Sequence, residues 1–270
     1  MPPVETSTGI ERIAAAFTGH GRRAALMPYL MGGFPTIDDS VRIAQAYIDG
    51  GADLIEFGLP FSDPLADGPV IHGAAVEALA NGTVIEKLLD NVGPIAQQVP
   101  TLLMTYFNLI EIRGVERFLG RAADLGVSGL IVPDIPLEES AVLLGPCDDH
   151  GIALIPLVAP TTPDERMARI CAQARGFIYT VSVTGTTGER TATADGLAEL
   201  VGRVRKHTEL PVAVGFGISD SGQASRVADV ADGAIVGTRL VREAGEAQQG
   251  GGDPAPAVEA VVREFSAALA

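Results

Sequence analysis

Residues 54–69 of the chain read LIEFGLPFSDPLADGP, a short apolar strand that contains one acid and runs into a loop with two more. A carboxylate at Glu56, between apolar neighbours, is costly to bury unless a partner stabilises it or a reaction uses it. Asp63 and Asp67 follow in a segment whose prolines fix φ and whose glycines permit tight turns, so both acids are held in place. Positioned acids at the end of a buried strand predict proton-transfer chemistry.

The order of a short apolar strand followed by a helix repeats along the chain, which predicts βα units and a parallel sheet. Similar glycine-containing joints between helix and strand, at 51–53, 126–128 and 151–153, favour a closed (β/α)₈ TIM barrel over an open sheet. The expected strands cover residues 25–30, 54–57, 101–106, 129–132, 153–157, 177–181, 212–214 and 233–236. The expected helices cover residues 37–50, 83–97, 115–125, 137–150, 163–174, 194–207, 219–230 and 254–269.

Additional helices are expected outside this repeat. One at 9–19 plugs the bottom of the barrel, one at 72–80 is inserted after the second strand, and one begins near Thr238 after the eighth. The glycine-rich run at 248–252 is predicted to be a mobile spacer before the last helix. A chain of 270 residues is of the size that α/β barrels commonly reach, so we expect residues 1–270 to form a single TIM-barrel domain.

The composition excludes several classes of protein. Hydrophobic residues make up 47% and aromatic residues 5%, which suits strands covered on both faces by helices. The net charge of −15 argues against binding to nucleic acid or to an anionic membrane surface. Cys147 and Cys171 show no metal or disulfide spacing, and neither a signal peptide nor an apolar run of about 18 residues is visible, so a soluble, cytoplasmic protein is expected.

Two glycine turns at the ends of expected strands predict a phosphate site. The seventh strand runs into 215–219 (GFGIS) and the eighth runs into Gly237 and Thr238. The loops after these two strands often bind phosphate in (β/α)₈ enzymes, because glycine lets backbone N–H groups approach the oxygens at a helix N-terminus. We expect Gly217, Gly237 and Thr238 to donate, with helix starts at Ser219 and near Thr238 adding their positive dipole ends.

The segment 56–69 resembles the signature of the alpha subunit of tryptophan synthase, E-x-G-x-P-F-S-D-P-x-A-D-G-P, and the resemblance extends from about residue 24 to 245. It implies retro-aldol cleavage of indole-3-glycerol phosphate to indole and glyceraldehyde 3-phosphate, with Glu56 and Asp67 as catalytic residues. It also implies a partner, a beta subunit that carries pyridoxal phosphate and receives the indole in an α2β2 heterotetramer. No cofactor is expected in this chain itself.

The same resemblance assigns further residues. The polar loop 183–194 contains the family pattern V-T-G-x-T-G and is interpreted as a lid, whose Thr187 is expected to bond Asp67 and whose Gly188 joins the phosphate site. By resemblance the indole slot is lined by six residues, Leu26, Met104, Tyr106, Ile131, Tyr179 and Phe216. The family places the hydroxyl of the tyrosine at position 179 near the catalytic glutamate.

The residue types in the expected site fit acid–base chemistry. Burial of Glu56 would raise its pKa towards the working pH, and Asp67 could accept the indole N–H and stabilise the ring as it becomes cationic. No lysine stands at a strand end to form a Schiff base, and the four histidines fall on helices or linkers, so no metal is expected. Two alternatives remain open: another phosphosugar barrel enzyme, such as an isomerase, and a non-catalytic phosphate-binding subunit.

Overall fold

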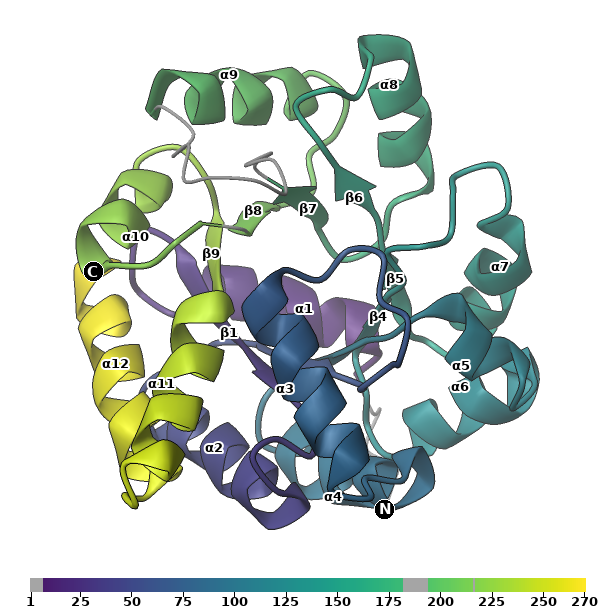
Figure 1. Cartoon of the computed structure of the whole chain (residues 1–270). Helices are drawn as coiled ribbons and strands as arrows, with labels where there is room; N and C mark the ends of the chain where they lie inside the picture. Colours follow the sequence, from purple (N-terminus) through teal and green to yellow (C-terminus); the bar gives the residue numbers. More distant parts are fainter. Residues whose placement is uncertain (1–6, 182–193, 216) are drawn as a thin grey trace, which may run out of the picture.

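A computed structural model describes residues 7–181, 194–215 and 217–270 and shows a parallel β-barrel inside a layer of helices (Figure 1). The strands follow one another in the order β5-β4-β3-β2-β1-β9-β8-β7-β6, and each strand is parallel to its neighbours in this order. Their bounds are β1 Ala25–Met31, β2 Ile55–Gly58, β3 Thr101–Met104, β4 Gly129–Ile131, β5 Ala153–Ile155, β6 Leu157–Val158, β7 Ile178–Val181, β8 Val212–Gly215 and β9 Gly233–Val236. The predicted (β/α)₈ barrel is confirmed.

The barrel closes through the stretch at 153–158, of which residues 153–157 were expected to form one strand. Pro156 divides it into β5, which pairs with β4, and β6, which pairs with β7. Proline has no N–H to donate to a neighbouring strand, which is the physical reason for the break. Its carbonyl still accepts a hydrogen bond of 3.1 Å from the N–H of Tyr179, so the two short strands together bridge the gap.

The helices cover the outside of this barrel, and most of the expected ones are present. Their bounds are α1 Gly9–Thr18, α2 Ile37–Asp49, α3 Pro69–Ala80, α4 Ile85–Ala96, α5 Phe107–Glu111, α6 Val115–Asp124, α7 Ala141–Asp149, α8 Asp164–Gln173, α9 Ala194–Val204, α10 Ser221–Ala228, α11 Thr238–Gln249 and α12 Pro254–Ala268. The short helix α5 was not expected. It begins where the carboxylate of Asp134 accepts the N–H of Phe107 at 2.9 Å.

Helix α1 closes one end of the barrel, as predicted. It starts with a capping box between Thr8 and Glu11, and its buried residues are Ile13 and Phe17. These two side chains join the core inside the barrel, where the rings of Phe17 and Phe177 lie 5.3 Å apart. Figure 1 shows α1 behind the strands, whereas α3 lies in front of them.

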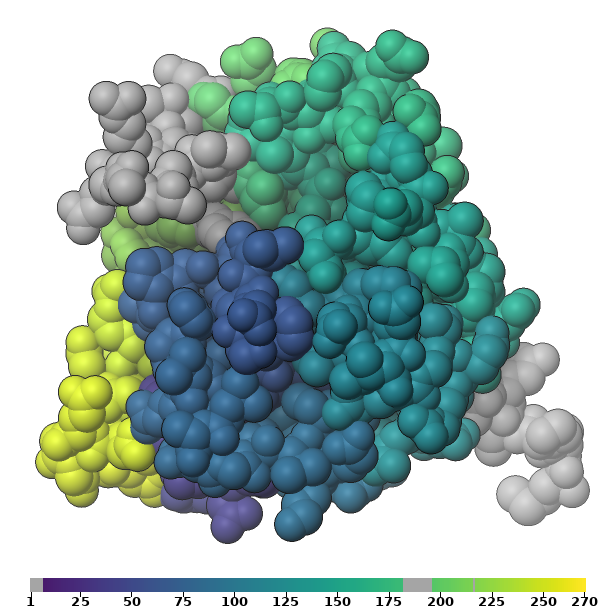
Figure 2. Space-filling view, turned by 45° about the vertical axis from the view of Figure 1, so that its right-hand side comes forward, coloured from purple at the N-terminus to yellow at the C-terminus, as the bar shows by residue number. Residues whose placement is uncertain are grey.

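The extra helices α3 and α11 lie side by side against β1, and Figure 2 shows the blue segment that contains α3 on the same face as the yellow C-terminal helices. The glycine-rich run after α11 was predicted to be a mobile spacer, and this prediction is wrong. Backbone hydrogen bonds from Gly250 to Glu246 (3.0 Å) and from Gly252 to Ala247 (2.8 Å) fold it into a compact turn. Helix α12 follows directly and packs against α2.

Candidate active site

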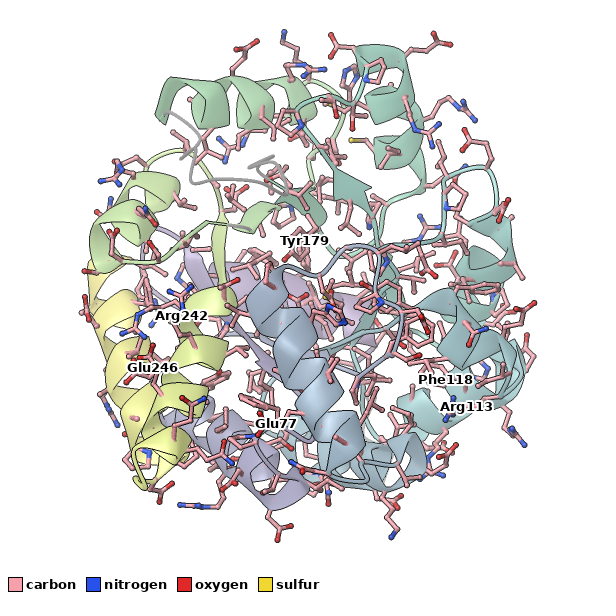
Figure 3. All side chains as sticks on the ribbon, in the orientation of Figure 1. Glu77, Arg113, Phe118, Tyr179, Arg242 and Glu246 are labelled. Carbon is pink, nitrogen blue, oxygen red and sulfur yellow. The ribbon has the colours of Figure 1, made fainter. Side chains whose placement is uncertain are left out.

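Glu56 lies inside the barrel on β2. Its neighbours Ile55 and Phe57 belong to the core between strands and helices, because successive side chains of a strand point to opposite faces. The exposed fraction of Glu56 is 1%. Its Oε2 accepts a hydrogen bond of 3.5 Å from the hydroxyl of Tyr179, whereas Oε1 has no partner among the described residues. Figure 3 shows Tyr179 in the centre of the barrel.

Burial raises the pKa of Glu56 to about 8, against the opposing hydrogen bond from Tyr179 and with a smaller contribution from the negative charge of Asp67. A carboxylic acid with such a pKa exchanges a proton near neutral pH, which is the property that a general acid and base needs. The negative charge of Asp67 therefore acts on Glu56. The structure therefore places a buried carboxyl with a raised pKa at the position where the sequence predicted an acid–base group.

Asp67 is positioned by the end of β3. The hydroxyl of Tyr106 donates a hydrogen bond of 3.0 Å to Oδ1 of Asp67 and accepts one of 3.1 Å from the N–H of Ala66. The ring of Tyr106 in turn stacks on Phe61, with centroids 5.1 Å apart. Partial burial raises the pKa of Asp67, while the Tyr106 hydrogen bond and the nearby His72 act in the opposite direction. The loop thus presents a fixed carboxylate.

The structure adds Tyr29, which the sequence analysis missed. It is 4% exposed, pairs in register with Glu56, and its hydroxyl lies so close to Gly58 that a Cβ there would sit 2.2 Å from it. Tyr29 also lies close to Gly237, because a Cβ added to this glycine would be 3.5 Å from the Cβ of Tyr29. One side chain therefore connects the strand of the acid with the expected phosphate turn. The alternation of β1, with Ala25 and Met27 facing inward, would have identified it.

Leu26 does not reach this site. It belongs to the core between β1 and the helices, because it has the opposite parity to Met27 and Tyr29 in the strand. Its backbone N–H donates to Asp53, which also pairs with Arg22. The expectation that Leu26 lines the indole slot is therefore corrected, and Tyr29 occupies the inward position closest to the acid.

The other apolar residues expected in the slot form one layer of the barrel. The register pairs Gly58 with Met104, and Met104 with Ile131. This layer lies directly beyond the one that contains Glu56 and its partner Leu102. Met104 and Ile131 therefore line the barrel interior on the side to which the acids point. Tyr106 is near them, but its hydroxyl is occupied by Asp67.

The glycine turns that were expected to bind phosphate follow neighbouring strands, β8 and β9. Gly217 has a φ of +85°, which favours glycine, and Gly237 is the N-cap of α11 with no side-chain capping bond. Within the first turn of α11 the N–H of Leu240 donates to the carbonyl of Gly237 at 2.9 Å. The N–H groups of Thr238 and Arg239 at the start of the helix are therefore the candidates for binding an anion. Thr187, Gly188 and Phe216 lie outside the described residues.

The neighbouring helix α10 differs from the prediction. It begins at Ser221 and not at Ser219, because the side chain of Asp220 caps it by accepting the N–H of Gln223 at 2.8 Å. Ser219 instead donates its N–H to the side chain of Gln223. A carboxylate already neutralises the dipole of this helix end, whereas the first turn of α11 contains no acid.

A cavity of about 260 Å³ lies beside the site, over the ends of β4 and β6, and neither acid is part of its lining. Its wall is mostly apolar, and its one guanidinium, Arg166, is paired with Glu138 at 2.7 Å. In the described ranges no group of three or more His, Cys, Asp or Glu side chains is arranged to hold a metal ion. The described helices include none long and apolar enough to cross a membrane.

The barrel, the buried glutamic acid, the loop aspartate and the glycine turns define a (β/α)₈-barrel enzyme that carries out acid–base chemistry at the carboxyl ends of its strands. The family model for the tryptophan synthase alpha chain matches residues 17–270. The chain belongs to the tryptophan synthase alpha chain family. That family performs the retro-aldol cleavage of indole-3-glycerol phosphate in tryptophan biosynthesis, and the chain is a lyase of this kind.

Known relatives agree over most of the chain. The tryptophan synthase alpha chain of Prochlorococcus marinus (strain MIT 9313) is 49% identical over 233 residues, which cover 84% of each chain. That of Methanosarcina mazei is 45% identical over 249 residues, covering 92% of this chain and 90% of the relative. Among solved structures, the alpha chain of Legionella pneumophila subsp. pneumophila superposes with a TM-score of 0.88 at 32% identity and covers 98% of both chains. Tryptophan synthase of Mycobacterium tuberculosis gives a TM-score of 0.87 at 35% identity, with 98% and 99% covered.

Proposed function

We propose that Glu56 and Asp67 carry the retro-aldol reaction in this chain. The observation that supports the proposal is that the charge of Asp67 acts on Glu56 while the two carboxyls lie in different environments. Glu56 is buried and has a pKa of about 8, whereas Asp67 lies in a loop and is held by the hydroxyl of Tyr106. Environments that separate the proton affinities of two acids are typical of an acid–base pair with distinct roles.

In the first step Glu56 delivers its proton to C3 of the indole ring, and Asp67 accepts a hydrogen bond from the ring N–H that stabilises the cation. In the second step the Glu56 carboxylate removes the proton of the side-chain hydroxyl next to C3. The oxygen forms a C=O bond, the bond to C3 breaks, and its electron pair restores the neutral indole. Glu56 ends the cycle protonated, so the protons balance.

A Schiff-base reaction does not fit this chain. Its two lysines, Lys87 and Lys206, lie exposed on or just after the outer helices α4 and α9. Neither reaches the barrel interior, where an imine with the substrate would have to form. Acid–base catalysis by carboxyl groups is therefore the mechanism that the site supports.

The phosphate of the substrate binds, in this proposal, to the N–H groups of Gly217, Gly237 and Thr238, with Gly188 from the loop after β7. Tyr29 spans from Gly237 to Gly58, which supports one ligand reaching both the phosphate turn and the acids. Thr187 would complete the bonding of Asp67 when the loop closes over the substrate. Met104, Ile131 and Phe216 would contact the indole ring.

The partner that we propose is a tryptophan synthase beta subunit with pyridoxal phosphate, in an α2β2 assembly that receives the indole. The loop around Asp63 and the first turn of α5 at Asn108 are the candidate contact surface, and Leu65 supports this choice because its exposed fraction is 85%. Asp134 is left out of this surface, because its carboxylate accepts the N–H of Phe107 at the start of α5. The free, buried cysteines agree with a location in the cytoplasm, and residues 1–270 as a single domain remain a prediction.

The test is the release of indole from indole-3-glycerol phosphate by the purified chain, with and without a beta subunit. We expect Glu56→Gln to lose at least about 100-fold in turnover while it still binds the substrate, because the amide cannot transfer the proton. If the variant releases indole as fast as the unaltered chain, Glu56 is not the acid and base. Substrate binding without any turnover in the unaltered chain would favour a non-catalytic phosphate-binding subunit.

A further inference from the structure

Three tyrosine hydroxyls lie around the two acids, and two of them have a carboxylate partner. Tyr179 donates to Glu56 and Tyr106 donates to Asp67. The hydroxyl of Tyr29 is different: its one hydrogen-bond partner among the described residues is the thioether sulfur of Met31, at 4.0 Å. Sulfur is a weak acceptor, so a buried phenol is left almost without a polar partner.

A second polar atom without a partner is found on the adjacent strand. Oε1 of Glu56 is buried and accepts no hydrogen bond from the described residues. Tyr29 and Glu56 are paired in the register of β1 and β2, so their side chains leave the sheet on the same face. A donor with only a weak acceptor, Tyr29, and an acceptor without a donor among the described residues, Oε1 of Glu56, therefore lie on paired residues inside the barrel.

The glycine at position 58 explains how the phenol reaches this place. A Cβ on Gly58 would lie 2.2 Å from the hydroxyl and 2.7 Å from Cζ of Tyr29. The ring thus lies directly against the backbone two residues after Glu56, where no larger residue would leave room. Tyr179 uses the same arrangement on the other side of the barrel, since a Cβ on Gly215 would lie 2.5 Å from its hydroxyl.

We propose that Tyr29 is a positioning residue for the acid, whose hydroxyl donates to Oε1 of Glu56 when the carboxyl ionises, while Tyr179 holds Oε2. To form this bond, the hydroxyl turns away from Met31 and the carboxyl group of Glu56 turns towards it. The two phenols together stabilise the carboxylate on the half of the cycle in which Glu56 removes the hydroxyl proton. The inference rests on the proposed role of Glu56.

The other groups that face Glu56 do not supply this bond. Asp67, from the loop after β2, adds a negative charge, and Tyr106, from the end of β3, is occupied by Asp67. His72 on α3 acts on Asp67. Asp67 and Glu56 also raise the pKa of Tyr29, beyond the effect of its burial, so the phenol stays protonated and remains a donor.

The experiment follows the protonation of Glu56 in the ligand-free protein. Infrared difference spectra over a pH series detect the C=O band of a buried carboxylic acid, and its absence from Glu56→Gln assigns the band. In Tyr29→Phe we expect the measured pKa of Glu56 to rise by about one pH unit, because a hydrogen bond to the charged form is lost. The ring and its packing are retained.

Tyr47→Phe is the matched control. Tyr47 is a buried tyrosine on α2 whose hydroxyl donates to the carbonyl of Tyr29 at 3.1 Å, outside the acid site. Its loss lowers stability, and we expect it to leave the titration of Glu56 unchanged. An equal shift in both variants would show a merely structural effect and overturn the proposal, as would no shift in Tyr29→Phe.

A second variant covers the case in which Tyr29→Phe does not fold. Site-specific 3-fluorotyrosine at position 29 makes the phenol a stronger donor with little change in size, so the pKa of Glu56 should fall. A value that stays the same or rises contradicts the proposed bond. These measurements use no substrate, so they are independent of the indole-release assay. If the chain releases no indole but the pKa of Glu56 shifts as expected, the proposed reaction is rejected and the Tyr29–Glu56 bond is retained.

Discussion

The hydroxyl of Tyr106 and the carboxylate of Asp67 are joined by a hydrogen bond of 3.0 Å, although the residues are 39 positions apart in the chain. The same hydroxyl accepts the N–H of Ala66, so one phenol fixes both the side chain and the backbone of the acid's loop. Because β3 is rigid and the loop is not part of the sheet, the strand end determines where the carboxylate points.

Tyr106→Phe should lower kcat about tenfold, because Asp67 loses the bond that orients it and a hydrogen bond to a charged group is of that magnitude. KM should change much less, since the phosphate contacts are elsewhere. The check is steady-state indole release. Phe61→Leu is the control: it removes the stacked ring and keeps the hydroxyl, so stability should fall while kcat stays within about threefold. Equal kcat values for Tyr106→Phe and the unaltered chain would contradict the role of this bond.

The buried acid should make stability depend on pH in a defined direction. The pKa of Glu56 is raised from 4.5 to about 8, so between these values the folded chain binds a proton that the unfolded chain has released. The contribution of Glu56 to stability is therefore most favourable at low pH and declines as the pH rises towards 8.

Glu56→Gln removes this titration. We expect the variant to gain on the order of 4 kcal/mol relative to the unaltered chain between pH 5 and pH 8.5, as measured by urea unfolding at both values. If the stability difference between the two proteins does not depend on pH, Glu56 is ionised in the folded chain over the whole range from pH 5 to pH 8.5.

Gly58→Ala should disrupt the site by steric conflict, because the new methyl group would lie 2.2 Å from the hydroxyl of Tyr29. We expect a loss of about 2 kcal/mol of stability and a large loss of kcat/KM, since a core clash displaces the ring. Gly73→Ala on α3 is the matched control, because a Cβ there has no neighbour within 4 Å and alanine favours the helix. Comparable losses in both variants would reject the close contact as the cause.

The two helix ends near the phosphate site should respond differently to charge. Thr238→Glu places a carboxylate at the start of α11, where it stabilises the helix and repels the phosphate, so KM should rise at least about tenfold with stability preserved. Asp220→Ala removes the cap of α10 and should lower stability by about 1 kcal/mol without altering KM. The reverse pattern would place the phosphate at α10.

Much of the fold and of the acid pair could be predicted from the sequence, because the signals are local. The alternation of apolar strands with helices predicted the barrel, and an acid at Glu56 in an apolar strand followed by a proline-rich loop with Asp67 predicted the chemistry. Leu26 was wrongly assigned to the indole slot because the alternation of side chains between the two faces of its strand was not taken into account. A single shift in parity moves a side chain from the interior to the helix layer.

The sequence by itself determined which residues form strands and helices and which carboxyls are the candidates for the chemistry, since these depend on neighbours in the chain. Only the tertiary structure decided the partners: Tyr179 for Glu56, Tyr106 for Asp67, and Tyr29 against both Gly58 and Gly237. The tertiary structure also showed that Pro156 divides one expected strand into two, of which one pairs with β4 and the other with β7. These relations arise from strand register and barrel closure, which join residues far apart in sequence and leave no periodic pattern to read.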